Sequence, residues 1–473
     1  MPTPLEWLAI LSKQLDHRAR EIEDLEDWYE GDHPIPAPPP NTAAGVDAEA
    51  RLAFDAMQKL AITNFLPPIV DAPASKLRIE GYRSSRAKVG SDADLWVIHR
   101  RNHLVSDARI AITEAVKVGQ TAAVVWADAA GQATIEVEDP EHVIVAYEPG
   151  SRRRRSAALK RWEGDDEHLY ATVYLPDGLY KYRSKGDATA TARGEANNRP
   201  AAELWEPREV PNETWPLANP LGVVPMVEIR VNADLKAHRF GGGCSQFGKE
   251  IGDQKRINRT VFNRLITEEH QAFRQRWVTD WDVPLDADGR PDKAQILKSS
   301  AARMMIFNND DPMGGSPKVG EFAQADFNPF LRAVQEDVKA MASKSATPPY
   351  AFLLGDMVNV AGDALARIEG AHLGVVSGLA DELDDAFVEI MRLALRVEGD
   401  SRAGDPSLSV VWGEFEQRTA TEQANLAQIA KGLGVPIEDV FAMLPGVDQA
   451  KAQDWARSVL ASELRAAATP TAP

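Results

Sequence analysis

The chain of 473 residues contains a single cysteine, Cys244. One cysteine can form neither an internal disulfide nor a cluster of thiolate zinc ligands, so the composition fits assembly in a reducing cytoplasm. No apolar run reaches the length of about 18 residues that a membrane-spanning helix needs. The first fifteen residues also lack the continuous apolar core of a secretory signal. We therefore expect a soluble protein that is not exported by this route and has no membrane partner.

Basic residues are scarce relative to acidic ones. The chain has 53 Lys and Arg against 71 Asp and Glu, which gives a net charge of -18. A surface of this charge repels a polyanion, which argues against a tight, sequence-reading DNA binder. The length exceeds what one hydrophobic core serves, so several structural units are expected.

The sequence also lacks a convincing catalytic or cofactor motif. No Gly-x-Ser-x-Gly elbow and no recognisable Ser/His/Asp set is present. Gly243–Glu250 approaches the phosphate-binding P-loop, but Glu250 stands where Ser or Thr must hold magnesium. The preceding strand pattern ends at Val231, too far upstream for a strand–loop–helix cradle. A glycine hinge that leads into a helix is the preferred interpretation.

Two further patterns have both a chemical and a structural interpretation. His99 and His103 are spaced like zinc ligands on a helix, but the glutamate of the metalloprotease motif and a third ligand are missing, which favours surface histidines. The run Arg152–Arg155 attracts phosphate in principle, yet a solvated turn is favoured in so acidic a chain. We predict no catalytic residue, no metal site and no cofactor.

The first half of the chain predicts a helix, a linker and a mixed region. Apolar residues at helical spacing indicate an amphipathic helix over 4–29 that ends near Gly31. A proline-rich linker follows at 31–48, and an α+β region spans 49–244. Within this region we expect a helix near 94–118, strands at 121–126, 134–138 and 142–147, and a hairpin of 169–175 with 179–182, in which Asp177-Gly178 supplies positive φ angles.

The second half predicts two long helices around an insert, followed by a longer helix. The helices are expected at 245–275 and 327–345, and the insert at about 278–323. A loop at 347–362 leads to a helix over 363–398, which would be roughly 54 Å long. A strand at 408–412, helices up to residue 466 and a disordered tail at 467–473 complete the chain.

A series of short stretches occurs along the chain in a fixed order: Trp28–His33, Gly81–Arg83, Trp96 with Asn102 and Leu104, Asn219–Val227, Gln254, Asn258, Gln275–Val278, Thr347-Pro348, and Asn359 with Ala364 and Glu369. Together these stretches resemble the portal proteins of long-tailed bacteriophages, in particular the actinobacteriophage branch. Family members usually read Asn-x-Ser-x-x-Ala-x-x-x-x-Glu after the loop, and Asn359, Ala364 and Glu369 match that pattern, whereas Ala361 replaces the serine. A helix-capping hydroxyl must then come from elsewhere, such as Asp363.

The resemblance implies a helix-rich α+β portal fold. Its parts are an N-terminal helix with linker (1–48), a wing (49–244), a first stem helix (245–277), a clip (278–323), a second stem helix (324–346), a tunnel loop (347–362), a long tunnel helix (363–398), a strand returning to the wing (399–416), a helical crown (417–466) and a tail (467–473).

The resemblance further implies a ring of twelve subunits at one capsid vertex, assembled in the host cytoplasm, that passes double-stranded DNA without sequence specificity. The implied partners are the terminase large subunit, the head–tail adaptor, and the major capsid and scaffold proteins. The residues expected to face DNA from the tunnel loop are Tyr350, Asp356, Asn359 and Asp363, and the clip residues expected to meet the motor and adaptor are Asp286, Asp288, Arg290 and Lys293.

An acidic band on the long helix would weaken binding of DNA if it faces the channel. DNA binds tightly where Lys or Arg side chains displace its counterions, and an acidic wall offers no such cations. The band consists of Asp381, Glu382, Asp384, Asp385 and Glu389. Most charge runs of this kind are simply solvated helix faces. Two other classes of protein stay open: an acidic, oligomeric structural protein of a phage head or tail, and a nucleotide-dependent enzyme built on the 243–250 loop.

Overall fold

The computed structural model describes most of the chain, which divides into two compact units, Met1–Gly413 and Glu414–Pro473. The described residues are 2–33, 57–86, 91–211, 213–234, 240–272, 276–279, 288, 304–307, 318–321, 326–352, 362–416, 420–442, 444, 447 and 449–468. The expected linker therefore lies outside the described residues from position 34 onward.

Helix α1 (Pro4–Glu30) confirms the predicted N-terminal helix. Thr3 and Glu6 form a capping box at its start, and Gly31 at φ 90° ends it in a left-handed conformation. Its apolar stripe, which includes Leu8, Leu11 and Leu15, is buried against a sheet. The helix is thus held by a core on one face.

Two antiparallel sheets form the centre of the first unit, as the α+β prediction requires. The larger has the order β4-β5-β6-β7-β8, with β9 paired to β7, and the smaller has the order β10-β2-β3. The strands of the larger sheet are β4 (Val143–Tyr147), β5 (Arg155–Glu163), β6 (Leu169–Tyr174), β7 (Gly178–Ser184), β8 (Trp205–Pro207) and β9 (Leu217–Ala218). Those of the smaller sheet are β2 (Gln120–Ala127), β3 (Ala133–Glu138) and β10 (Met226–Arg230).

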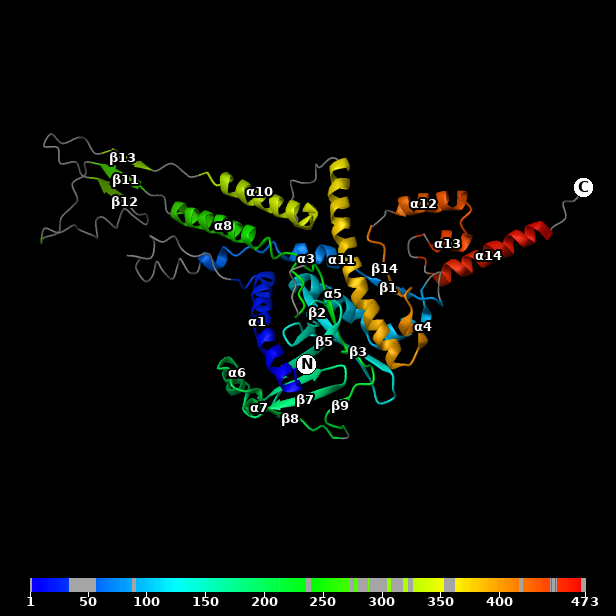
Figure 1. Cartoon of the computed structure of the whole chain (residues 1–473). Coiled ribbons are helices and arrows are strands. Elements are labelled where there is room, and N and C mark those ends of the chain that lie inside the picture. Colours follow the sequence, from blue (N-terminus) through cyan, green and yellow to red (C-terminus); the bar gives the residue numbers. More distant parts are fainter. Residues whose placement is uncertain are drawn as a thin grey trace, which may run out of the picture. The chain divides into compact units, whose positions relative to one another are not determined.

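The larger sheet is buried on both faces. Ile144 and Ala146 of β4 pack in the cluster that contains α1, whereas Val143 and Val145 pack with residues of the smaller sheet. Alternate side chains of a strand point to opposite faces, so β4 reads as a continuous apolar run. Helices α5 (Leu104–Val118) and α11 (Gly362–Val397) pack against the smaller sheet, and Figure 1 shows α1 beside the strands of the larger one.

The predicted strands at 121–126, 134–138 and 142–147 are confirmed, but β5, β8 and β9 were not anticipated, nor were the short helices α6 (Ala188–Ala196) and α7 (Ala201–Leu204). The basic run 152–155, interpreted as a solvated turn, ends in the first residue of β5. Arg155 is largely buried there because it reaches Glu389 of α11, with 2.7 Å between Nη2 and Oε1. The solvated turn is thus confirmed for Arg152–Arg154, which are exposed and outside regular structure, but not for Arg155.

The hairpin β6–β7 is confirmed, but its turn differs from the prediction. The backbone N–H of Leu175 donates to Gly178 O (2.9 Å), and neither Asp177 nor Gly178 has a positive φ. Gly178 instead pairs with Ala218 of β9, and a Cβ atom at this position would lie 3.1 Å from Leu217 O. Its missing side chain serves the approach of β9, not the conformation of the turn.

The single helix predicted over 94–118 is wrong, because the structure has two helices, α4 (Ala93–Arg101) and α5. The break falls at His103, whose φ is 55°. Asn102 donates to Ile98 O (3.0 Å) and Ala133 O (3.1 Å), and it accepts from the N–H of Ile135 (2.8 Å). These bonds to β3 override the helical preference of the segment.

The helix–insert–helix pattern is confirmed in outline. Helix α8 (Ile251–Ala272) lies beside α10 (Asn328–Ser345), as Figure 1 shows, and between them in sequence come β11 (Arg276–Thr279), β12 (Met304–Phe307) and β13 (Lys318–Glu321). Strand β11 pairs in parallel with β12 and antiparallel with β13. The first stem helix that the resemblance implies, 245–277, is too long at both ends, since 245–250 is not helical and Arg276 and Trp277 belong to β11.

The chain enters α8 through a close crossing of backbone segments. The N–H of Cys244 donates to Val231 O (3.0 Å), and the N–H of Val231 donates to Gly119 O (3.0 Å). A Cβ atom on Gly243 would lie 1.8 Å from Gly119 O and 2.5 Å from Val231 O. Only glycine fits this position, which explains the hinge inferred from the sequence.

The remaining elements of the first unit extend this framework. They are α3 (Pro67–Ala74), β1 (Ile79–Arg83), the 3-10 helices η1 (Pro349–Phe352) and η3 (Ser401–Gly404), and β14 (Ser409–Trp412), which pairs antiparallel with β1. The strand at 408–412 and the 36-residue helix α11 confirm two predictions. Helix α11 begins at Gly362, one residue before the expected start.

The second unit is helical, as predicted. It consists of α12 (Ala420–Gly432), α13 (Ile437–Ala442) and α14 (Gln449–Ala468), around a small core of Ala427, Ala430 and Val440. The boundary of the expected tail at residue 467 is wrong by two residues, because α14 continues to Ala468. Residues 469–473 lie outside the described part of the chain.

The backbone crossing predicts a large difference between two identical substitutions. Gly243→Ala places a methyl group against two carbonyl oxygens and should lower the free energy of unfolding by about 3 kcal/mol or more. Gly252→Ala adds the same methyl group where no heavy atom lies within 4 Å, so stability should be unchanged or slightly higher. Chemical denaturation monitored by circular dichroism measures both, and equal stability of the two variants would contradict the assignment.

Candidate functional site

The two ends of the predicted tunnel loop are joined by a three-residue clamp of Lys76, Tyr350 and Glu369. Tyr350 Oη donates to Glu369 Oε2 (2.9 Å), and Lys76 Nζ lies 3.0 Å from Glu369 Oε1. Burial raises the pKa of Glu369, but the hydrogen bonds from Lys76 and Tyr350 outweigh it and lower the pKa overall. The carboxylate therefore stays ionised and ties η1, α11 and the chain after α3 together.

A second set of contacts sets the course of the chain where α10 ends. Ala346 adopts φ 51°, and Ser345 Oγ donates to Met341 O (2.9 Å) and lies 2.9 Å from Thr347 Oγ1. His372 of α11 reaches Ala346 O through Nδ1 at 3.3 Å. Burial lowers the pKa of His372, which favours the neutral ring. Both Thr347 and His372 are buried, so the loop leaves α10 from a fixed point.

The base of α8 is anchored by two buried amides. Gln254 Oε1 accepts from the N–H of Phe65 (2.9 Å), and Asn258 Oδ1 accepts from the N–H of Thr63 (3.2 Å). Asn258 also lies 3.4 Å from His33 Nε2, and His33 stacks on Trp28 with ring centroids 4.0 Å apart. Gln254, Asn258, Trp28 and His33 all belong to the stretches that resemble portal proteins.

Ion pairs hold α8 and α10 together as antiparallel neighbours. Arg256 Nε lies 2.9 Å from Asp337 Oδ1, and Lys344 Nζ lies 2.7 Å from Asp253 Oδ2. Asp253 is buried, whereas the two cations remain about half exposed. The earlier residue of α8, Asp253, pairs with the later residue of α10, Lys344. This order shows that the two helices run in opposite directions.

The acidic band on α11 is divided by the structure. Glu389 binds Arg155, and Asp384 accepts from the N–H of Val410 of β14 (2.8 Å). Asp381, Glu382 and Asp385 are exposed. Only these three of the five acids are available for contacts outside the chain.

Only some of the other predicted site residues lie in the described part of the chain. Tyr350 is 52% exposed beside the clamp, Asp363 is the second residue of α11, and Asp288 lies in an exposed turn. Asp356 and Asn359 of the loop, and Asp286, Arg290 and Lys293 of the clip, lie outside the described residues. The structure thus brings together the loop ends but leaves the expected DNA and motor contacts as predictions.

The P-loop-like segment is not arranged to bind phosphate. The N–H groups of Cys244, Gln246 and Gly248 already donate to Val231 O, Val116 O and Ser245 O. Glu250 is buried at the end of the segment, and burial raises its pKa. A phosphate cradle requires free backbone N–H groups, and these donors are occupied.

The histidine pair is not a zinc site, and the prediction of two surface histidines is also wrong. His99 is 1% exposed, stacks on Trp96 (centroids 4.5 Å apart) and lies 3.1 Å from Tyr82 Oη through Nδ1. His103 is exposed at the break between α4 and α5. The backbone break separates the two rings that an uninterrupted helix would place on one face. Among the described residues no group of three or more His, Cys, Asp or Glu is arranged to hold a metal ion.

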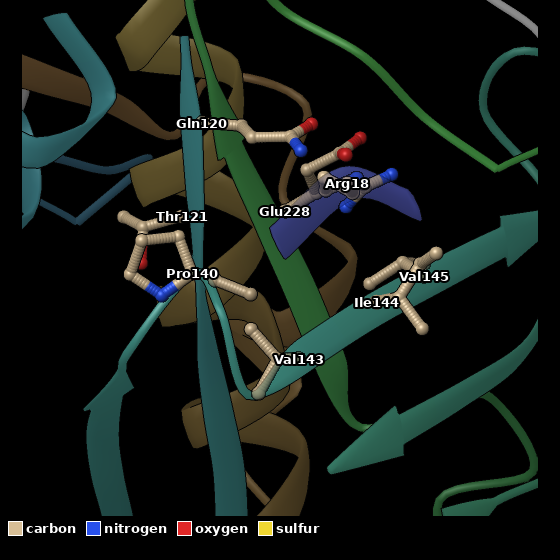
Figure 2. A pocket seen from close by; sticks show the side chains of 9 residues that line it. Arg18, Gln120, Thr121, Pro140, Val143, Ile144, Val145 and Glu228 are labelled. Carbon is tan, nitrogen blue, oxygen red and sulfur yellow. The ribbon is translucent and has the colours of Figure 1, made fainter. Parts of the chain in front are cut away.

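Figure 2 shows a small cavity where Arg18 of α1 meets both sheets. Its volume of about 10 Å³ has room for roughly one water molecule. With its amide oxygen turned toward Arg18, Gln120 accepts from Arg18 Nε (2.7 Å) and donates to Glu228 (3.1 Å), which also accepts from Tyr147 Oη (2.9 Å). The cluster satisfies a buried arginine and joins α1 to β2 and β10.

Sequence reasoning missed the residues that complete these networks. Glu369 was singled out by resemblance, but nothing around Lys76 marked it as the partner. Similarly, Arg402 is buried between Asp92 (2.8 Å) and Asp400 (2.6 Å), and no local pattern indicated it. The Lys76–Glu369 and Arg402–Asp92 pairs are long-range contacts, which a linear pattern does not contain.

The buried His99 predicts a pH dependence of stability. Burial lowers the pKa of His99 to about 4, whereas an unfolded histidine titrates near 6.5. Between these values the unfolded chain binds the extra proton, so this residue makes stability fall as the pH decreases, by up to about 1.4 kcal/mol per pH unit. His99→Gln should flatten the denaturation profile between pH 6.5 and 4.5. The exposed His103, changed in the same way, is the control, and equal profiles for both variants would contradict this assignment.

The clamp predicts a measurable coupling between Lys76 and Glu369. Their side chains are 15% and 30% exposed, so a double-mutant cycle of Lys76→Met and Glu369→Gln should give a coupling of about 1–2 kcal/mol. The pair of Lys339 and Glu336 on α10, at 42% and 71% exposure, should give less than about 0.5 kcal/mol. Equal coupling in the two cycles would show that the clamp is only a surface ion pair.

Comparison with known proteins identifies a family but no individual curated relative. No curated protein matches the chain significantly. None of the described helices is long and apolar enough to cross a membrane. The family model described as "Phage portal protein, SPP1 Gp6-like" matches residues 8–458, nearly the whole length. The chain therefore belongs to the SPP1 Gp6-like family of phage portal proteins.

Proposed function

We propose that twelve copies of this chain form a closed ring at one capsid vertex, through which double-stranded DNA is packaged and later ejected. The observation that carries the proposal is the order of elements within the family match: α8, the β11–β13 insert, α10, a clamped loop and the 36-residue α11. Portal proteins are structural components of the virion. Such a role needs a shaped opening and no chemical step.

The parts of the chain take the following roles in this proposal. The two sheets with α1, α3, α4 and α5 form the wing, α8 and α10 the stem, β11–β13 the clip, and the second unit the crown. The clip meets the terminase large subunit during packaging and the head–tail adaptor afterwards. The major capsid and scaffold proteins contact the ring on surfaces outside the clip.

The clamp supports a specific role for the loop. Tyr350 and Glu369 lie on either side of residues 353–361 and are hydrogen-bonded to each other, while Lys76 connects both to the wing. A loop held at both ends can project toward DNA, with Tyr350, Asp356, Asn359 and Asp363 nearest to it, without loosening the helices. The charge of -18 keeps the ring from binding the polyanion tightly.

The rival nucleotide-dependent enzyme is disfavoured by the occupied N–H groups of the 243–250 segment. The rival wall or tube protein would not need two antiparallel rods around a small sheet. Neither alternative is supported by a specific contact in the described part of the chain.

Electron microscopy of the purified full-length protein tests the proposal directly. The expected result is closed rings with an axial opening and twelvefold symmetry. Sheets, open tubes or a persistent monomer at micromolar concentration would overturn it. Addition of ATP should change neither the rings nor the melting temperature, whereas a clear ATP-induced rise in melting temperature that Lys249→Ala abolishes would favour the enzyme.

A further inference from the structure

A wide groove follows α5, between this helix and the chain that runs from α3 to β1. Its volume is about 1210 Å³. Two large apolar side chains that line it are exposed, Val105 at 63% and Ile110 at 55%. A groove with exposed aliphatic side chains is a suitable seat for another segment of protein.

The groove also carries three arginines without a partner among the described residues: Arg78, Arg100 and Arg109. The acids of the groove already have contacts, since Glu114 pairs with Lys117 (2.9 Å) and Asp71 accepts from Tyr29 Oη (2.7 Å). Other arginines of this acidic chain, such as Arg155 and Arg402, bind carboxylates of their own subunit. The groove is therefore a basic site left open in a chain with net charge -18.

The exposed face of α11 has the opposite character. Asp381, Glu382 and Asp385 are exposed within about one helical turn and have no partner among the described residues. In the turns before them, a Cβ atom on Gly374 or Gly378 would meet nothing within 4 Å. The helix thus presents three acids next to a stretch where another backbone can approach closely.

We propose that the acidic face of α11 in one subunit docks in the α5 groove of the neighbouring copy, with Asp381, Glu382 and Asp385 opposite Arg78, Arg100 and Arg109. The proposal rests on the ring described under Proposed function. A ring requires two unlike, complementary surfaces on every subunit, because each contact joins different faces. Among the described residues, the α5 groove and the exposed face of α11 form such a pair, each with three charges left open.

Size and charge both favour a second copy as the occupant. A helix is about 10 Å in diameter, so two turns occupy roughly 850 Å³, which the groove of 1210 Å³ accommodates. DNA fits less well, since the groove contains two acids as well as three arginines and is lined by apolar side chains. The proposal assigns the exposed acids to a subunit interface in place of the channel wall predicted from the sequence.

A charge-reversal experiment tests this assignment with the full-length chain. The first variant carries Arg78→Glu, Arg100→Glu and Arg109→Glu, and the second carries Asp381→Lys, Glu382→Lys and Asp385→Lys. All six side chains are exposed, so both variants should fold like the wild type by circular dichroism. In either variant alone, the groove and the α11 face of neighbouring copies carry charges of the same sign. Ring formation should then need at least tenfold more protein than the wild type, as measured by sedimentation velocity and electron microscopy.

Two rescue measurements exclude a trivial loss of folding. The chain with all six substitutions has matched charges again and should regain rings. An equimolar mixture of the two triple variants should also assemble, because alternating subunits then meet acid to base at every contact. A misfolded variant would be rescued in neither case. The single changes Arg109→Glu and Asp385→Lys, which perturb the surface less, should show the same pattern with a smaller shift.

The outcomes separate this inference from the proposed function. Wild-type protein that forms no ring would overturn both. Rings from either triple variant at the wild-type concentration would overturn the interface while leaving the ring intact, as would a folded mixture that stays monomeric. If the Asp381→Lys, Glu382→Lys, Asp385→Lys variant forms normal rings that retain DNA, the result would overturn the interface and favour the predicted position of these acids on the channel wall.

Discussion

The helices α8 and α10 depend on buried polar contacts at one end, and these contacts fix the position of the segment before α3. Gln254 and Asn258 are fully buried, and each is satisfied by backbone groups of residues 63–65. A buried amide without partners is destabilising by about 1–3 kcal/mol, so the segment before α3 must lie against the base of α8. Asp253 extends the same anchor to Lys344 of α10. Two helices that pack mainly on each other are in this way joined to a large core.

A second level of organisation comes from how the chain distributes its charges. Cations with a structural role are matched to acids inside the subunit, as in Arg155–Glu389, Arg402–Asp92 and Lys76–Glu369. These pairs join segments that are far apart in sequence. The acids left on the surface give the chain its negative charge, which suits a passage for DNA because a wall of fixed cations would hold the polymer in place.

The sequence predicted the elements whose signal is local. The long helix expected over 363–398 is α11, where His372, Leu379, Leu383 and Phe387 recur at helical spacing and are buried, and Gly31 ends α1 in the conformation expected of a glycine. The clamp was only half visible, because Glu369 belonged to a family pattern and Lys76 did not. Similarly, Asn102 breaks a helix through bonds to β3, which no local preference of residues 94–118 reveals.

At the crossing of Gly119, Val231 and Gly243, main-chain hydrogen bonds join the smaller sheet to the segment that leads into α8. A joint of this kind has no side chain whose size can be adjusted, so sequence drift cannot shift it gradually. Relatives that differ in the placement of the helices corresponding to α8 and α10 should instead vary at the amide anchors Gln254 and Asn258, where one exchange of side chain alters the distance between segments. The two glycines would then persist even where their surroundings diverge.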